Sequence, residues 1–178
     1  MLQKAFVINI KKKNNMGSAL YQKLFRGKKE DKDTRVNWND NPIRPGAFSI
    51  LWGEETEYID PMFDEIRQKF KDQSIVIGAC FMKIKPQSVF PPHVDPGRPL
   101  GVNFPLSESF ENSGVDIYSN NIVVSQVFSE CPYIIDTSIT HGAHNTTDEE
   151  TIFLSLSFSK DIDFAQLVKW QLEGELLI

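Results

Sequence analysis

The sequence has few cysteines and few histidines, and it contains no long apolar run. No stretch approaches the roughly 20 apolar residues of a membrane-spanning helix, so we expect no membrane association. The apolar stretch from Ala5 to Ile10 is short and lacks a small-residue cleavage site, which disfavours a signal peptide. Cys80 and Cys131 have no metal-type spacing. We therefore expect two reduced thiols in a cytoplasmic protein.

The sequence also lacks an excess of basic charge. Lys and Arg total 19 against 24 Asp and Glu, giving a formal net charge of −5, which argues against a nucleic-acid partner. The one basic cluster, residues 11–13, is interpreted as a solvated strand end. No internal repeat or low-complexity tract interrupts the 178 residues, which fit one domain with a sizeable core. Nothing in the pattern indicates an oligomeric state.

The N-terminal portion, residues 1–73, is predicted to mix helices and strands. Strands are expected over 5–10 and 47–52, helices over 17–25 and 60–71, and a long surface loop over 26–46. Asp60 and Pro61 favour the start of the second helix, because Asp caps a helix and Pro suits its first turn. The long loop, Trp38 and Trp52 are candidates for a substrate cleft or its lid, although Trp52 equally suits the core.

From residue 74 the pattern changes to short β-rich runs separated by turn residues. Eight strands are predicted, over 75–85, 88–94, 100–106, 115–119, 121–128, 132–136, 139–144 and 151–159. That density indicates a sandwich, jelly roll or barrel. The last run alternates Leu and Phe with Ser, so one of its faces is apolar and the other small and polar. We expect a β core over 74–160 and a C-terminal segment, 161–178, with a helix over 163–173.

The chemistry is indicated by His93-Val94-Asp95 and the distant His141. Residues i and i+2 of an extended segment point to the same side, so His93 and Asp95 can share a site. Two imidazoles and one carboxylate form the facial triad that holds Fe(II) and leaves other positions open for ligands. The alternative is a hydrogen-bonded set without a metal, in a jelly-roll interaction module.

Three stretches carry a resemblance to a known family: residues 85–95, residues 102–106 and residues 136–158. They resemble Fe(II)- and 2-oxoglutarate-dependent oxygenases of the double-stranded β-helix fold, most nearly the aspartyl/asparaginyl β-hydroxylase-like branch. The resemblance implies a mainly β jelly roll with flanking helices, similar to cupins. It also implies Fe(II), 2-oxoglutarate as co-substrate, and hydroxylation of a small molecule, an amino acid or a peptide side chain.

Two histidines compete for the third ligand position. In the pattern of the resembled family the distal histidine precedes an asparagine by four positions, as His141 precedes Asn145. His144 stands directly beside Asn145 and does not fit. The resemblance therefore assigns His93, Asp95 and His141 as the metal ligands and catalytic centre. His144 is expected at the surface or near the site entrance.

The sequence departs from the family at the co-substrate anchor. The resemblance implies an arginine about ten residues beyond the distal histidine, where this chain has the uncharged Thr151. Because a buried carboxylate needs a cation, another basic side chain must replace it. Arg98 is the first candidate and Lys83 the second, if the lysine face of its strand points into the barrel. Asn103 and Thr151 are candidates for hydrogen bonds to the co-substrate.

Lys85 and Lys160 are weaker candidates for the same cation, since Lys160 ends the last strand and is expected to be exposed. If no cation replaces the missing arginine, the chain is expected to be a cupin-like protein that binds a metal or ligand without oxygenase turnover.

Overall fold

The computed structural model describes residues 5–7, 39–40, 46–53, 64, 66–106, 112–128 and 132–176. The predicted helix over 17–25, most of the loop over 26–46, and residues 60–63 and 65 of the helix over 60–71 lie outside these ranges. Trp38 and Cys131 also lie outside them. Cys80 is a free thiol, as expected.

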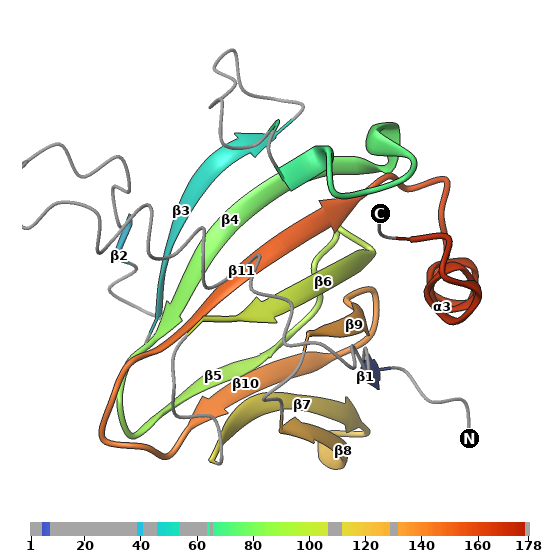
Figure 1. Ribbon diagram of the computed structural model, residues 1–178. Helices are drawn as coiled ribbons and strands as arrows, with labels where there is room; N and C mark the ends of the chain where they lie inside the picture. The colour runs from blue at the N-terminus through green and yellow to red at the C-terminus, as the bar shows by residue number, and fades with distance from the viewer. Residues whose placement is uncertain are drawn as a thin grey trace, which may run out of the picture.

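The described residues form two antiparallel β-sheets (Figure 1). The major sheet has the strand order β1-β9-β6-β11-β4-β3-β2, and the minor sheet has the order β5-β10-β7-β8. The major-sheet strands are β1 (Ala5–Val7), β2 (Asn39–Asp40), β3 (Gly46–Gly53), β4 (Val76–Ile84), β6 (Leu100–Pro105), β9 (Tyr133–Asp136) and β11 (Thr151–Phe158). The minor-sheet strands are β5 (Ser88–His93), β7 (Ser113–Ser119), β8 (Ile122–Phe128) and β10 (His141–Asn145).

From β4 onward the chain crosses repeatedly between the sheets: β4, β6, β9 and β11 belong to the major sheet, and β5, β7, β8 and β10 to the minor one. This is the predicted mainly β jelly roll, or double-stranded β-helix, and all eight predicted strands are present within a few residues of their expected bounds. The sequence did not indicate that β1, β2 and β3 extend the major sheet.

The face of the major sheet that points away from the minor sheet is apolar. On β11 it carries Ile152, Leu154, Leu156 and Phe158. These side chains pack with Leu167 in the outer apolar cluster of the major sheet. Leu167 lies on the helix α3 (Phe164–Glu173), which Asp163 caps at its start and Gly174, in a left-handed conformation, ends. A short 3-10 helix, η2 (Gln73–Ile75), leads into β4 and adds Ile75 to the same cluster.

The space between the two sheets is filled by a second apolar cluster. The major sheet contributes Ile84, Tyr133, Ile135 and Phe153, and the minor sheet contributes Val115, Ile117 and Val127. Because side chains alternate along a strand, Thr151 and Ser155 share the inner face of β11 with Phe153. The serine face of β11 therefore points into the barrel, and its leucine face points away from it.

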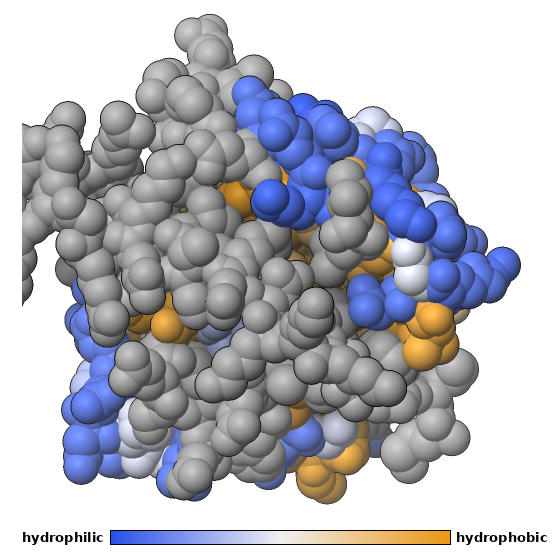
Figure 2. All heavy atoms as spheres, viewed as in Figure 1, coloured by the Kyte–Doolittle hydropathy of each residue, from blue (hydrophilic) through white to orange (hydrophobic). Residues whose placement is uncertain are grey.

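The β7–β8 hairpin turns at Asn120 and Asn121, whose φ angles are 51° and 63°. Both values lie in the left-handed region, as a two-residue type I′ turn requires, and asparagine tolerates this region better than most residues. In the space-filling view, hydrophilic residues gather along the edge over the start of β4 and α3 (Figure 2). Within the described residues, no helix is long and apolar enough to cross a membrane.

The outer apolar cluster should dominate stability. Leu156 is fully buried on β11, so Leu156→Ala is expected to lower the free energy of unfolding by about 3 kcal/mol, because it removes packed methyl groups and leaves a cavity. Leu172→Ala is the matched control, because Leu172 is 70% exposed on α3; its effect should stay within about 0.5 kcal/mol. Urea denaturation measures both. Equal effects of the two substitutions would contradict this assignment of the core.

Candidate metal centre

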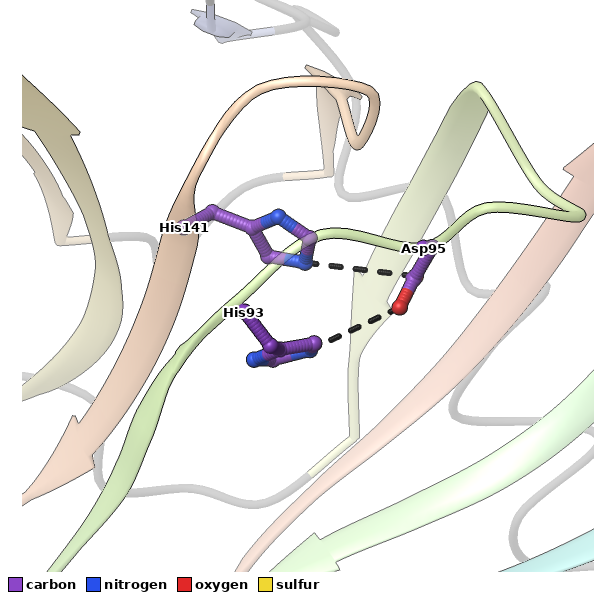
Figure 3. Close-up of side chains that lie close together, drawn as sticks. All are labelled: His93, Asp95 and His141. Carbon is purple, nitrogen blue, oxygen red and sulfur yellow. Dashed lines mark ion pairs between the residues drawn. The ribbon is translucent and has the colours of Figure 1, made fainter.

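His93, Asp95 and His141 meet at one end of the barrel, near the edge of the minor sheet (Figure 3). His93 ends β5 and His141 begins β10, and the two are register partners in the antiparallel pair. Asp95 follows His93 by two residues and points back toward both imidazoles. The structure therefore brings together the three residues that the sequence singled out, from segments far apart in the chain.

The donor atoms of the triad face one another at distances that suit a shared ion. His93 Nε2 lies 3.5 Å from Asp95 Oδ1, and His141 Nε2 lies 3.9 Å from Asp95 Oδ2. These distances are too long for good hydrogen bonds. Two donors bound to one metal at about 2.1 Å each lie roughly 3 Å apart, so a small contraction would complete a metal site. One potential donor atom from each residue lies within 4.8 Å of the others.

Both imidazoles are oriented in the same way. His93 Nδ1 lies 2.8 Å from the carbonyl of Pro91, and His141 Nδ1 lies 2.9 Å from the carbonyl of Ile139. In each case the carbonyl belongs to the residue two positions earlier. A carbonyl can only accept, so Nδ1 carries a proton, and in the neutral imidazole Nε2 keeps its lone pair for a metal. The fold thus selects the tautomer that binds a metal through Nε2.

The electrostatic environment also favours a neutral His141. Burial lowers the pKa of His141, and the nearby His93 and Arg98 lower it further; the hydrogen bond to Ile139 and the Asp95 carboxylate oppose them. A neutral imidazole is the form that binds a metal. His93 and Asp95 remain partly exposed while His141 is buried, so the centre opens on the side of His93 and Asp95.

Thr137 ties the Asp95 turn to the loop that leads to His141. Its carbonyl accepts from the Asp95 backbone N–H at 3.0 Å, its own N–H donates to Pro99 at 3.0 Å, and its hydroxyl donates to the Arg98 carbonyl. These three bonds hold the turn at residues 95–99 against the loop between β9 and β10. No local sequence signal identifies Thr137, because its partners lie about 40 positions away.

Arg98, the first candidate for the replacement cation, points into the barrel. Its Nη1 lies 3.8 Å from Asp95 Oδ2, and its Nη2 donates to Ser155 Oγ at 2.7 Å. A Cβ at position 101 would lie 2.3 Å from Nη2, so a larger residue there would displace the guanidinium from this position. Arg98 Nε is buried and has no hydrogen-bond partner among the described residues.

A chain of buried hydrogen bonds continues from Arg98 into the major sheet. Ser155 accepts from Arg98 and donates to Asn103 Oδ1, and Asn103 Nδ2 donates to the Tyr133 hydroxyl at 3.0 Å. Burial raises the pKa of Tyr133, so its hydroxyl stays protonated. Asn103 was predicted at the site; Ser155 and Tyr133 were not, although the serine alternation in β11 was a signal for Ser155.

The prediction that Lys83 could replace the missing arginine is wrong. Lys83 is the register partner of Ile152, whose side chain belongs to the outer apolar cluster, so it points away from the barrel interior. Its Nζ lies 3.5 Å from Glu150 Oε1. Lys85 and Lys160 are exposed, as expected for Lys160. Among the described residues, Arg98 is therefore the candidate cation that reaches the triad.

Thr151 lies inside the barrel but away from the triad. It is the register partner of Ile84 and is fully buried, and its Oγ1 has no hydrogen-bond partner among the described residues. Thr151 and Ser155 are four residues apart on one strand, which corresponds to about 13 Å. The hydroxyl of Thr151 is thus remote from the guanidinium of Arg98.

The structure separates His144 from the site. Side chains alternate along β10, so His144 points to the opposite face of the minor sheet from His141. His144 Nδ1 lies 3.0 Å from Asp116 Oδ2, and Gln126 donates to the same carboxylate at 2.7 Å. The expectation that His144 lies at the surface or near the entrance is wrong, because it is 8% exposed and bound to Asp116.

No family model matches the sequence, and no curated protein matches it. Among solved structures, a prolyl-4-hydroxylase from Pseudomonas putida is similar, with a TM-score of 0.54 and 14% identity over 81% of this chain and 85% of that one. An oxidoreductase of the 2OG-Fe(II) oxygenase family from Burkholderia pseudomallei has a TM-score of 0.51 and 11% identity over 70% and 72% of the two chains.

A third solved structure, the cupin domain of Cnp3 from Schizosaccharomyces pombe, has a TM-score of 0.42 and 11% identity over 78% of this chain and 75% of that one. The two oxygenase structures and this chain share one fold.

His141 and His144 allow a direct test of the ligand assignment. His141→Ala should weaken Fe(II) affinity by more than about 100-fold, which exceeds the 10–100-fold cost typical of losing an outer hydrogen-bond partner. His144→Gln should leave the affinity unchanged, because His144 lies on the other face of the sheet. Anaerobic titration calorimetry measures the affinities, and circular dichroism checks that both variants are folded. Equal losses in the two variants would refute the assignment.

Thr137 offers a second test. Thr137→Val keeps the size of the side chain but removes the hydroxyl that holds the Arg98 carbonyl, so the Asp95 turn should loosen and Fe(II) affinity should fall by about tenfold. Thr137→Ser keeps the hydroxyl and should bind like the natural protein. The same titration compares them. A Val variant with unchanged affinity would show that the backbone bonds alone position Asp95.

Proposed function

We propose that this chain is a non-haem Fe(II)- and 2-oxoglutarate-dependent dioxygenase that hydroxylates a small molecule, an amino acid or a peptide side chain. The observation that carries the proposal is the triad itself: two Nε2 lone pairs and one carboxylate converge from β5, its following turn and β10. Such a set binds Fe(II) on one face and leaves the opposite positions open.

The donor set and its surroundings fit iron better than a closed structural site. Three protein ligands leave the remaining positions for exchangeable ligands, as in catalytic metal sites. No sulfur belongs to the triad, which disfavours the cysteine-rich sets of structural zinc. When bound, Fe(II) together with a 2-oxo acid and dioxygen supplies the oxidant for C–H hydroxylation.

The chain's own residues have distinct parts in this proposal. His93 and His141 present Nε2 to the metal, because their Nδ1 atoms donate to backbone carbonyls. Asp95 supplies a negative charge that partly neutralises the positive charge of the metal ion. Arg98 supplies a fixed positive charge beside Asp95, where it can bind a carboxylate that approaches the metal.

The resemblance in three stretches of sequence also favours the aspartyl/asparaginyl β-hydroxylase-like branch. These stretches are residues 85–95, 102–106 and 136–158. The pair formed by the distal histidine and the asparagine four positions later supports this choice, since His141 begins β10 and Asn145 ends it. Asn145 is fully buried and donates to the carbonyls of Ile84 and Glu149, so it anchors the far end of the strand that carries His141.

A second candidate is a cupin-like protein that binds a metal and a carboxylate without oxygenase turnover. The observation that favours it is Thr151, which provides a neutral hydroxyl where the resembled oxygenases provide an arginine. The two candidates share the metal centre and differ in whether a bound 2-oxo acid is consumed.

Anaerobic addition of 2-oxoglutarate to the Fe(II)-loaded protein should produce a weak visible charge-transfer band, because a 2-oxo acid that chelates Fe(II) has such a band. Asp95→Ala should abolish the band together with most Fe(II) affinity. Absorption spectroscopy measures both. A featureless spectrum at saturating concentrations in the natural protein would count against the dioxygenase.

The release of succinate on admission of dioxygen separates the two candidates. Succinate formation that depends on Asp95 supports the dioxygenase, even without an identified substrate. A normal band without any succinate supports the cupin-like binding protein.

A further inference from the structure

We infer that the centre holds its acid by one carboxylate only, the one next to the metal, and that the tail of the acid is not bound inside the barrel. The ligand class is therefore 2-oxo monocarboxylic acids as well as 2-oxoglutarate. The inference rests on the proposed function, since it concerns the acid that binds together with the metal.

The position of Arg98 is the first argument. A metal bound to Asp95 Oδ2 at about 2.1 Å would lie no more than about 6 Å from Arg98 Nη1, which is 3.8 Å from that oxygen. The guanidinium cannot withdraw easily, because Ser155 holds Nη2 and the backbone of Gly101 packs against it. Its positive charge thus stands beside the metal ligands and faces an anion bound there.

The donors that remain on Arg98 are the second argument. A guanidinium has five N–H donors in a rigid fork. Ser155 accepts one of them. The Ser155 hydroxyl donates to Asn103, so it presents a lone pair rather than a proton to Arg98. The buried Nε has no partner among the described residues, and a buried donor without an acceptor is costly. One carboxylate would supply that acceptor.

The packing behind the triad is the third argument. Phe153 lies on the inner face of β11 between Ser155 and Thr151, and it packs with Val115 and Val127 of the minor sheet and with Ile84. None of these four side chains is more than 7% exposed. They fill the interior with carbon atoms, so a second carboxylate placed there would lose its water without gaining a partner.

Thr151 gives the fourth argument. Its hydroxyl is the buried polar group at the far end of β11, about 13 Å along the strand from Ser155. The two carboxyl carbons of 2-oxoglutarate are only roughly 5 Å apart, given bonds of about 1.5 Å. An acid held by Arg98 at one end cannot reach Thr151 at the other. The tail of the acid must therefore point toward the open side of the centre.

A matched pair of acids tests this inference. 2-Oxopentanoate has the same five-carbon chain as 2-oxoglutarate but no second carboxylate, and pyruvate is shorter still. On the full-length, Fe(II)-loaded protein under anaerobic conditions, titrations followed by the charge-transfer band should give dissociation constants for 2-oxopentanoate and pyruvate within about threefold of that for 2-oxoglutarate. A preference of tenfold or more for 2-oxoglutarate over 2-oxopentanoate would overturn the inference.

Arg98→Gln should weaken all three acids by a similar factor, about 10- to 100-fold, which is the usual cost of losing a hydrogen bond to a charged group. Fe(II) affinity is measured separately, because Arg98 also lies near Asp95. Lys160→Gln is the control that removes one exposed positive charge; it should leave all dissociation constants unchanged. An Arg98 variant that loses 2-oxoglutarate selectively would assign Arg98 to the distal carboxylate and refute the inference.

The failures of the two proposals are distinguishable. If Fe(II) binds but none of the three acids does, both the dioxygenase proposal and the one-carboxylate inference fall. If all three acids bind and 2-oxoglutarate binds far more tightly, only the one-carboxylate inference falls.

Discussion

The register between β5 and β10 places His93 opposite His141, and the geometry of the candidate metal centre depends on this pairing. A slip of one residue would turn His141 to the outer face of the minor sheet, because neighbouring side chains of a strand point to opposite faces. That outer face is where His144 lies, bound to Asp116. Asn145 resists such a slip, since its buried amide donates to Ile84 in the other sheet.

Two backbone features convert this register into a convergent set of donor atoms. Each imidazole donates from Nδ1 to the backbone carbonyl of the residue two positions earlier. The backbone conformation at the strand end therefore orients the ring. Asp95 lies in a turn and has no strand to hold it. Thr137 supplies the missing support by bonding the turn to the loop before β10. The ligands are therefore held by backbone bonds, which leave their metal-facing atoms free.

The inner face of β11 is polar near the triad, at Ser155, and apolar deeper in the barrel, at Phe153. Ser155 stands beside Arg98, and Phe153, two residues earlier, packs with the apolar residues between the sheets. The charge of Arg98 thus lies beside the triad, and the barrel interior behind the triad is filled by apolar side chains. Under the proposed function, this division favours ligands with their anionic group at the metal, and it accounts for Thr151 at the position where the resembled oxygenases have an arginine.

Strand positions and the triad were predictable from sequence because both rest on local patterns. Short β-rich runs separated by turn residues located all eight core strands, and the resembled family pattern, in which the distal histidine precedes an asparagine by four positions, selected His141 over His144. The same patterns could not say which face of a strand points inward, because that depends on how the two sheets pack. Tertiary packing alone turned Lys83 outward and Arg98 inward, and it joined Ser155 and Tyr133 to the site. Residues 50 or more positions apart, such as Arg98 and Ser155, meet only because hydrophobic side chains fill the space between the sheets and set the distance between them.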